Sequence, residues 1–433
     1  MDELTAEDWR GLKAEARRVY ERNEVDTDTA YFHMPSAEFY PSLFAWDSGF
    51  QAVVMIHLDL EKAKRELETL FERVSADGHM PHEVLVPCEE TRRQPTRNAM
   101  RWFARWEYDS RGASRLVDPP VFVYAAQLVF ERSRDGEWLS GIWRNLRRCI
   151  DYLLDLRDLM GDGLVSILHP WEAGTDLSPQ FFSVMGIDPS RAWHRFRAAA
   201  YGPLLYRFNN KMRWDPAALK ALNRFVVEDL TVNCLTIRAV ASAGILASAV
   251  GDENAARRYR SRASLMADAL DGICFDERSA CYYPRWNASS PGLARVRTAA
   301  SLLPLFTGLC DRGNCGRLVE EHLLSPDGFW TEHLLPFSPA GTLAGHSRWV
   351  EGRLWAGHCI WVNFNWMVAI GLGENGYLEE ARELTRRTVK MVLREGFCEY
   401  YDSRTGEGKR IHGFTWPGLA LDMMARFWPE VTG

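Results

Sequence analysis

The sequence lacks the hallmarks of several protein classes. No apolar run approaches the roughly 20 residues that a transmembrane helix needs, so we expect no membrane partner. The N-terminal stretch MDELTAEDWRGLKAEARRVYER has neither the basic start nor the apolar core of a signal peptide. No block of lysine or arginine stands out, and the net charge is −6, so we expect no nucleic-acid partner.

Cysteine pairs and cofactor motifs are also missing. The nine cysteines are an odd number, scattered from Cys88 to Cys398 without a CxxC pair, which indicates reduced thiols in a cytoplasmic protein. The sequence contains no HExxH, no GxSxG and no glycine-rich phosphate loop. We therefore predict no metal, no cofactor and no serine nucleophile.

What the sequence does have is helical periodicity. Amphipathic segments, such as the stripe Trp9, Leu12, Ala16 and Val19 after a Thr5-x-x-Asp8 capping box, alternate with segments that are apolar nearly all round. The apolar set is 48–58, 119–131, 230–249, 298–308, 360–372 and 416–428. Six alternations of this kind predict an all-α fold, an (α/α)6 barrel, formed by residues 1–433 as one domain. Residues 158–225 are surplus to the six pairs, and we interpret them as an insertion covering the active-site end.

The connections that lead into the apolar helices are rich in Trp, His, Asp and Glu. They include PSLFAWDSGF (41–50), DGHMPHE (77–83), HPWEAGTDLSP (169–179), WAGHCIWVNFNW (355–366), CEYYD (398–402) and GFTW (413–416). In a barrel of alternating helices these connections emerge at one end, where they would form a concave ligand site. The opposite connections, such as GDEN (251–254), are plain turns.

The chemistry of this mouth suits a sugar. Indole rings cover C–H faces, and carboxylates accept hydroxyls. Cleavage of a glycosidic bond needs one carboxylic acid and one carboxylate. HPWEAGTDLSP offers Glu172 and Asp176, with Gly174 permitting a turn between them, and EYYD offers Glu399 and Asp402. The pairing of Asp176 and Glu399 with aromatic neighbours favours a glycoside hydrolase.

WDSGFQA, MPHE, the helix that begins with Pro119-Pro120, HPWEAGTDLSP and EYYDSRTGEGKRIHGFTW resemble glycoside hydrolase family 63, and within it the bacterial mannosylglycerate and glucosylglycerate hydrolases. The resemblance covers nearly the whole chain. It implies an (α/α)6 enzyme that inverts configuration at an α-linked sugar, with Asp176 as general acid and Glu399 as general base. It also implies that the sugar is held by Tyr40, Trp46, Asp47 and Trp361.

The leaving-group side of the site departs from the family pattern. Asp118 stands where the family has Gln, Phe44 where it has Trp, and the segment from Trp355 to Cys359 replaces a Tyr-Trp-Arg-Gly-Pro run. We hypothesise that Asp118 favours a leaving group with an amine or an extra hydroxyl donor over an acidic one. The arginines of the insertion (Arg191, Arg195, Arg197 and Arg207) are read equally well as surface charges or as contacts of an acidic group. The remaining predicted substrate-binding residues are His82, Trp171, Gly174 and Trp416.

Three functions remain open from sequence. The first is an inverting α-glycosidase acting on a small α-glucoside or α-mannoside. The second is a sugar isomerase or epimerase on the same barrel, using His79, His82 and His358. The third is a catalytically silent sugar-binding protein, which predicts a damaged acid or base. In each case the partner is a small carbohydrate, and assembly into a homo-oligomer is compatible with the sequence.

Overall fold

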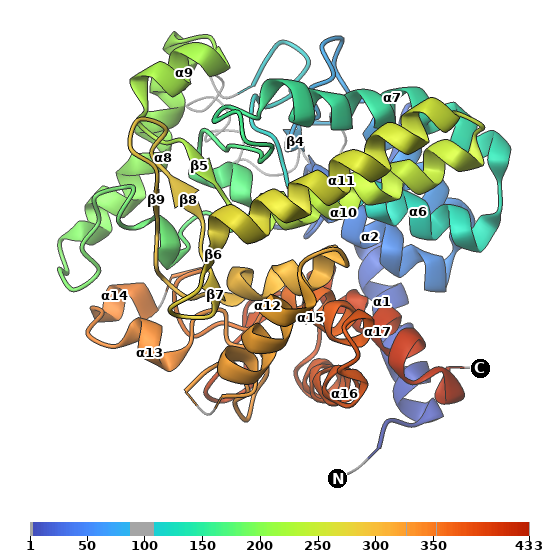
Figure 1. The fold of residues 1–433 in the computed structure, drawn as a ribbon. Coiled ribbons are helices and arrows are strands. Elements are labelled where there is room, and N and C mark those ends of the chain that lie inside the picture. Colours follow the sequence, from blue (N-terminus) through green and yellow to red (C-terminus); the bar gives the residue numbers. More distant parts are fainter. Residues whose placement is uncertain (1–2, 87–107, 326, 352, 433) are drawn as a thin grey trace.

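The protein is mainly helical, as the sequence predicts (Figure 1). The computed structural model describes residues 3–86, 108–325, 327–351 and 353–432. Elements with one buried face alternate along the chain with elements buried nearly all round. The first set comprises α1 (Ala6–Asn23), α3 (Leu60–Phe71), α7 (Gly136–Leu156), α11 (Glu253–Cys274), α12 (Arg312–Leu318) with η5 (Val319–Leu323), and α16 (Leu378–Glu395). The second comprises α2 (Ala45–Leu58), α6 (Val121–Ser133), α10 (Leu230–Ala249), η4 (Ala299–Thr307), α15 (Val362–Glu374), and η6 (Trp416–Gly418) with α17 (Leu419–Phe427).

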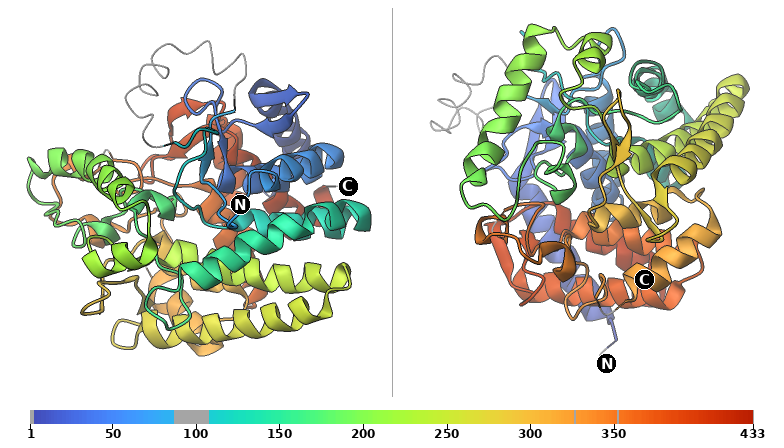
Figure 2. Two further views of the ribbon diagram at one scale, coloured as in Figure 1. Left: turned by 90° about the horizontal axis from the view of Figure 1, so that it is seen from above. Right: turned by 60° about the vertical axis from the view of Figure 1, so that its left-hand side comes forward.

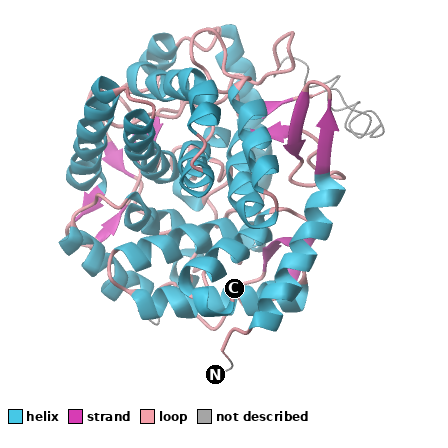
Figure 3. Ribbon diagram, turned by 90° about the vertical axis from the view of Figure 1, so that its right-hand side faces the viewer, coloured by secondary structure: helices cyan, strands magenta, loops and turns pink. Residues whose placement is uncertain are grey.

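The buried elements contact one another in a closed cycle. Each one contacts the next along the chain, from α2 through α6, α10, η4 and α15 to α17, and α17 returns to α2. Glycines allow the close approaches in this cycle, because a Cβ on Gly49 of α2 would lie 2.7 Å from the Phe122 nitrogen of α6. Figure 3 shows the helices arranged around this centre. The cycle places the hydrophobic core at the middle of the molecule.

Aspartate and threonine caps explain where several helices begin. The predicted capping box of α1 is confirmed, since Thr5 accepts from the Asp8 N–H and Asp8 accepts from the Thr5 N–H. The side chains of Asp59, Asp135 and Asp252 accept backbone N–H groups at the starts of the outer helices α3, α7 and α11. These polar caps fix the residue at which each outer helix begins.

Two predicted helices differ in form. The segment expected as a helix over 298–308 is the 3₁₀ element η4, which contains Pro304. Proline removes a backbone donor and disfavours α-helix, which accounts for the tighter winding. The amphipathic segment that follows η4, which the alternation also predicts as one helix, is divided into α12 and the π-helical η5.

Short strand pairs, which the sequence did not predict, lie between the helices. They are β1 (Glu24–Thr27) with β2 (Ala30–His33), β3 (Leu43–Phe44) with β4 (Glu83–Val84), β5 (Val227–Glu228) with β8 (Arg285–Trp286) and β9 (Gly292–Leu293), β6 (Phe275–Asp276) with β7 (Cys281–Tyr282), and β10 (Cys398–Tyr401) with β11 (Gly408–His412). All pairs are antiparallel. Most are too short to show an alternating pattern.

Residues 158–225 hold η2 (Pro170–Ala173), η3 (Pro179–Phe181), α8 (His194–Lys211) and α9 (Pro216–Leu222). In Figures 1 and 2, α8 and α9 lie at the same end of the molecule as β8, β9, α13 (Ala340–Leu343) and α14 (Arg348–Glu351). The short η7 (Pro429–Val431) follows α17.

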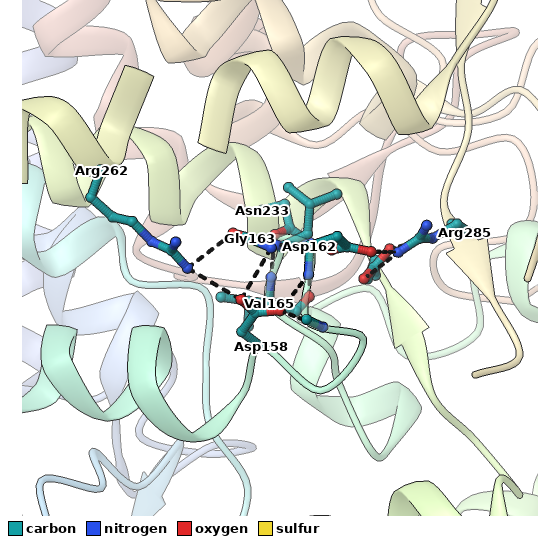
Figure 4. A network of polar contacts seen from close by, with 10 residues as sticks. Asp158, Asp162, Gly163, Val165, Asn233, Arg262 and Arg285 are labelled. Atoms are coloured by element: carbon teal, nitrogen blue, oxygen red, sulfur yellow. Dashed lines mark hydrogen bonds and ion pairs between the residues drawn. The ribbon is translucent and has the colours of Figure 1, made fainter. Parts of the chain in front are cut away.

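A polar network anchors the start of this segment to the helical core (Figure 4). The Asp158 carboxylate accepts the Gly161, Asp162 and Gly163 N–H groups at 2.9–3.1 Å. Asn233 of α10 makes two hydrogen bonds to the Val165 backbone, at 2.7 and 2.9 Å. The chain therefore enters the loop that carries Asp176 from a fixed point.

By length and apolar composition alone, the helix α10 could cross a membrane. This is contrary to our prediction that no apolar run approaches the length of a transmembrane helix. However, 83% of its most apolar window is buried inside the fold, as in a core helix of a globular protein. The eight cysteines of the described residues are buried and free of disulfides, and Cys88 lies outside the described residues.

Candidate active site

A cavity of about 290 Å³ lies at the ends of the core helices where their chains begin. Trp46 and Asp47 are in the first turn of α2, Trp361 is the N-cap of α15, and Trp416 begins η6. All the predicted site residues line this cavity: Tyr40, Phe44, Trp46, Asp47, His82, Asp118, Trp171, Gly174, Asp176, Trp355, Trp361, Glu399 and Trp416. Its lining also includes Pro35, Glu83, Tyr108, Ser114, Leu116, Tyr206, Leu354 and Phe414, which the sequence analysis did not assign to the site.

The loop that follows η2 carries Asp176 into the cavity. Gly174 ends η2 with φ +68, and a Cβ there would lie 2.7 Å from the Trp46 ring. Both the left-handed backbone and the close indole require glycine at this position. The turn at Gly174 separates the two carboxylates of the E-x-G-x-D motif.

Glu172 is turned into the protein interior. It is fully buried and accepts two hydrogen bonds from Arg157, at 2.7 and 3.0 Å, together with the Leu168 N–H at 2.7 Å. Although burial alone would raise the pKa of Glu172, the Arg157 charge and these hydrogen bonds hold it below its usual value. Glu172 is thus a charged structural group that fixes the loop, and Asp176 is the carboxyl of the motif that lines the cavity.

Asp176 has the opposite environment. Burial raises the pKa of Asp176 to about 7, opposed by its own backbone N–H and by no lysine or arginine of the described residues. A carboxyl group with such a pKa is substantially protonated near neutral pH. Asp176 can therefore donate a proton to a bound ligand.

Glu399 lies in β10, across the hairpin from β11. Its Oε1 accepts from the Tyr40 hydroxyl at 2.9 Å and from Arg410 at 2.8 Å. Its Oε2 is buried and has no hydrogen-bond partner within the described part of the chain. Burial raises the pKa of Glu399, and the Arg410 charge and the Tyr40 hydroxyl oppose that rise. One oxygen is fixed, and the other can accept a proton.

Arg410 was missed by the sequence analysis. It lies in β11, which pairs with β10 with a register shift between Cys398 and Tyr400. The glycine-containing segment SRTGEG between two short runs is a hairpin signal, and this could have placed Arg410 near Glu399.

Tryptophan rings form one wall of the cavity. Trp355 and Trp361 stack face to face, with ring centroids 3.7 Å apart and planes 9° apart. Trp416 meets Trp46 edge to face at 5.1 Å. Because each ring packs against others, the wall is rigid and presents indole surface of the kind that C–H groups of a sugar contact.

Two further carboxyl groups line the cavity beside this wall. Asp47 accepts from the Trp416 indole N–H at 2.7 Å, and Asp118 accepts from the Trp46 backbone N–H at 3.0 Å. Burial raises the pKa of Asp47 to about 8 and that of Asp118 well above its usual range. The N-cap of α2 is Phe44, so Asp47 lies within the first turn of this helix and does not cap it.

Of the three histidines considered for proton transfer, His82 lines the cavity, whereas His79 and His358 do not. His82 Nδ1 lies 2.6 Å from the Ser114 hydroxyl, and burial lowers the pKa of His82. The neighbouring Glu83 accepts from the Tyr108 hydroxyl at 2.5 Å.

The segment 158–225 contributes Trp171 and Tyr206 to the cavity wall. Gly202 of α8 lies directly against Trp171, since a Cβ there would be 2.9 Å from the indole. The four arginines of this segment that were considered as leaving-group contacts (Arg191, Arg195, Arg197 and Arg207) are exposed and do not line the cavity. Among the described residues, no group of three or more His, Cys, Asp or Glu side chains could hold a metal ion.

Over residues 40–417 the chain matches the family described as the mannosylglycerate hydrolase MGH1-like glycoside hydrolase domain. The chain belongs to this family. A mannosylglycerate hydrolase of Thermus thermophilus is 28% identical to it over 423 residues, covering 92% of this chain and 96% of the relative. The glucosylglycerate hydrolase of Mycolicibacterium hassiacum is 25% identical over 452 residues, covering 95% and 96%. The resemblance seen in the sequence is therefore confirmed, and the protein is a glycoside hydrolase of family 63.

Solved structures agree with this membership. The family 63 mannosylglycerate hydrolase from another strain of Thermus thermophilus, in complex with Tris and D-glycerate, matches with a TM-score of 0.79 at 27% identity, covering 96% of this chain and 100% of that one. The neutral trehalase of Saccharomyces cerevisiae matches with a TM-score of 0.62 at 14% identity, covering 95% and 79%, which shows a shared fold alone.

Proposed function

We propose that the enzyme is an inverting α-glycosidase that hydrolyses a small α-glucoside or α-mannoside. Asp176 is the general acid and Glu399 the general base. The observation that carries this assignment is the contrast between two carboxyl groups of one cavity. Asp176 is partly buried without a cationic partner among the described residues and has a pKa of about 7, whereas Glu399 pairs with Arg410.

The mechanism follows from these two environments. Protonated Asp176 donates its proton to the glycosidic oxygen as the bond to the anomeric carbon breaks. Ionised Glu399 takes a proton from a water molecule, which attacks the anomeric carbon from the opposite face and inverts its configuration. An inverting pair needs carboxyl groups roughly 6.5–9.5 Å apart to accommodate that water. After turnover Asp176 is ionised and Glu399 protonated, and exchange with solvent restores both.

The fold supports the same proposal. We propose that the closed cycle of core elements, with α1, α3, α7, α11, α12 and α16 outside it, is a single (α/α)6 barrel. The residues 158–225 form an insertion at its active-site end, because they contribute Trp171, Gly174, Asp176 and Tyr206 to the cavity. A cytoplasmic location and the oligomeric state stay predictions.

The relatives named above act on mannosylglycerate and glucosylglycerate, which supports glucose or mannose as the sugar. The leaving group is a separate question. The described lining of the cavity contains five carboxyl groups (Asp47, Glu83, Asp118, Asp176 and Glu399) and no lysine or arginine. These carboxyl groups can accept hydrogen bonds from an amine or a hydroxyl, and the described lining has no basic side chain to pair with a carboxylate. The lining therefore supports a neutral or amine-bearing leaving group over an acidic one.

A substrate panel tests the proposal. Purified enzyme is offered α-glucosides and α-mannosides whose leaving groups are neutral, amine-bearing or acidic, including glucosylglycerate and mannosylglycerate, and NMR records the first anomer released. We expect the β-anomer. Asp118→Gln is expected to lower the preference for amine-bearing over neutral glycosides, and improved turnover of neutral glucosides with the same preference would contradict the role of Asp118.

Variants assign the two carboxyl roles. Asp176→Asn and Glu399→Gln should each lower kcat by ~10²–10⁴-fold. Because a glycosyl fluoride needs little protonation of its leaving group, Asp176→Asn should lose much less activity on an α-glycosyl fluoride than Glu399→Gln does. Exposed carboxylates of the same segments provide controls, Asp188→Asn and Glu407→Gln, which should stay near wild type. Interconversion of a free aldose and ketose without hydrolysis would instead establish the isomerase.

A further inference from the structure

A second cavity, of about 470 Å³, lies at the same end of the molecule and shares no lining residue with the first. Its walls come from three parts of the chain: residues 179–189 after Asp176, residues 283–297 around the β8–β9 hairpin, and residues 341–346 in α13 and the connection that follows it. In Figure 1 these segments lie together at the end where α8, β8, β9, α13 and α14 are labelled. The cavity is large enough for a small metabolite.

The charge of this cavity is opposite to that of the first. Its described lining includes Arg295, Arg297 and His346, with the hydroxyl-bearing Ser183, Tyr283 and Thr342, and contains no aspartate or glutamate. The described lining thus offers several hydrogen-bond donors and no negatively charged acceptor, which suits an anionic ligand.

Arg297 is the central cation. It is partly buried, and the structure records no ion pair for it with any carboxylate of the described residues. Its Nη1 donates to His322 Nδ1 at 2.9 Å, and His322 Nε2 in turn lies 2.6 Å from the Ser279 carbonyl oxygen. A neutral imidazole positions the guanidinium without neutralising it. The Arg297 charge is thus oriented but uncompensated.

The other two polar groups complete the arrangement. His346 Nδ1 is buried and has no hydrogen-bond partner within the described part of the chain. Arg295 is ion-paired with Asp276 through Nε and Nη2, at 3.3 and 3.4 Å, so its remaining Nη1 group can donate to a ligand. Together the three side chains offer one uncompensated positive charge on Arg297, further donors on Arg295 and an imidazole around one space.

We propose that this second cavity is a binding site for a small phosphate-type oxyanion, either inorganic phosphate or the phosphate group of a small phosphorylated metabolite. The guanidinium of Arg297 matches two phosphate oxygens, and Arg295 and His346 supply further donors. The site is independent of the proposed catalytic roles of Asp176 and Glu399.

The test is calorimetric titration of the full chain with inorganic phosphate at constant ionic strength. We expect saturable binding of one phosphate per chain. Arg297→Gln should weaken it by about tenfold or more, since hydrogen bonds to charged groups are lost. Arg147→Gln removes the same charge from an exposed position on α7 and should change the affinity less than about twofold. No saturable binding, or equal weakening in both variants, would overturn the proposal.

Two further arms make the result specific. Glycerol phosphate should bind with the same dependence on Arg297 if the site takes a phosphate ester, and failure of glycerol phosphate alone would assign the site to inorganic phosphate. Binding of acetate or glycerate in place of either phosphate compound would contradict the ligand class. Asp176→Asn should bind phosphate as the wild type does, so loss of the hydrolytic proposal would leave this result unaffected. Circular dichroism of Arg297→Gln confirms that the variant is folded.

Discussion

At the scale of single residues, environment rather than residue type distinguishes the two carboxyl groups of the E-x-G-x-D motif. Glu172 and Asp176 are four positions apart, and both are acids in the same loop. Arg157 and backbone N–H groups lower the pKa of Glu172 against the effect of burial, whereas burial raises that of Asp176. Their contributions to stability must therefore have opposite signs at neutral pH.

Replacement of Asp176 should stabilise the protein at alkaline pH. An ordinary aspartate in the unfolded chain titrates near 3.8, and Asp176 in the folded chain titrates at about 7. Between these values the folded state holds a proton that the unfolded state has released, so its stability falls as the pH rises. Asp176→Asn should therefore raise the free energy of unfolding at pH 8 by ~1–4 kcal/mol, with a much smaller gain at pH 4. Denaturant titrations at the two pH values measure this.

Glu172→Gln provides the opposite case. This substitution leaves the fully buried Arg157 without a counter-ion, and we expect the free energy of unfolding at pH 8 to fall by ~3–5 kcal/mol. Destabilisation by Asp176→Asn at pH 8, or no loss in Glu172→Gln, would contradict the assignment of the two roles.

The pH dependence of kcat/KM should be bell-shaped. Activity should fall above pH ~7, as Asp176 loses the proton that it donates, and on the acid side as Glu399 becomes protonated. Arg410 opposes the rise of the Glu399 pKa, so Arg410→Gln should move the acid limb to higher pH and leave the alkaline limb in place. Arg404→Gln, in the same hairpin but paired with Asp402, should move neither limb. An alkaline limb that moves in Arg410→Gln would exclude Asp176 as its origin.

At the scale of elements, the turn after η2 depends on one glycine. A side chain on Gly174 would meet both a left-handed φ and the Trp46 ring. Gly161, in the same segment, has φ +79 but nothing within 4 Å of its Cβ position. Gly161→Ala should lower the free energy of unfolding only by the ~1–2 kcal/mol that a left-handed backbone costs a residue with a Cβ. Gly174→Ala should lower the free energy of unfolding by more than this. It should also lower kcat/KM, because the Trp46 indole or the loop that carries Asp176 must shift. Equal losses of stability in the two variants, measured by thermal unfolding, would show that Trp46 can move freely.

Elements also show where sequence reasoning succeeds. The starts and ends of the core helices lie within about three residues of their predicted positions. Helices enclosed on all sides are apolar all round, so the length of each apolar run sets the bounds of its helix. The site residues could be predicted because the starts of these helices converge at one end. Glu83, Tyr108 and Tyr206 could not, since their positions depend on the pairing of very short strands and on the packing of α8.

At the scale of the whole molecule, the cycle of core elements is closed by the contact between α17 and α2. Hydrogen bonds reinforce this closure: Asn23 donates to the Gly413 carbonyl oxygen at 2.9 Å, and Gln51 donates to the Thr415 hydroxyl at 3.1 Å. Asp47 of the cavity is held by Trp416 across the same junction.

Truncation after Thr415 should abolish cooperative folding. It removes η6 and α17 with the buried side chains of Trp416, Leu419, Leu421, Met423 and Met424. At ~1.5–3 kcal/mol for each buried side chain, the loss is comparable to the whole net stability of ~5–15 kcal/mol of a typical domain. Truncation after Trp428 removes only the short η7 and the residues beyond it, and should leave a cooperative thermal transition. A cooperative transition in the shorter chain would show that the cycle is stable when open.

The same junction has a consequence for synthesis on the ribosome. Asp47 and Trp416 are 369 residues apart, so the partner of α2 emerges only when nearly the whole described chain has been made. Until then the apolar flanks of α2 and α15 that face α17 stay uncovered, and the ends of a long loop must find one another at the final step. We therefore expect the nascent chain to be prone to aggregation through the uncovered flank of α2 for most of its translation, until α17 is released.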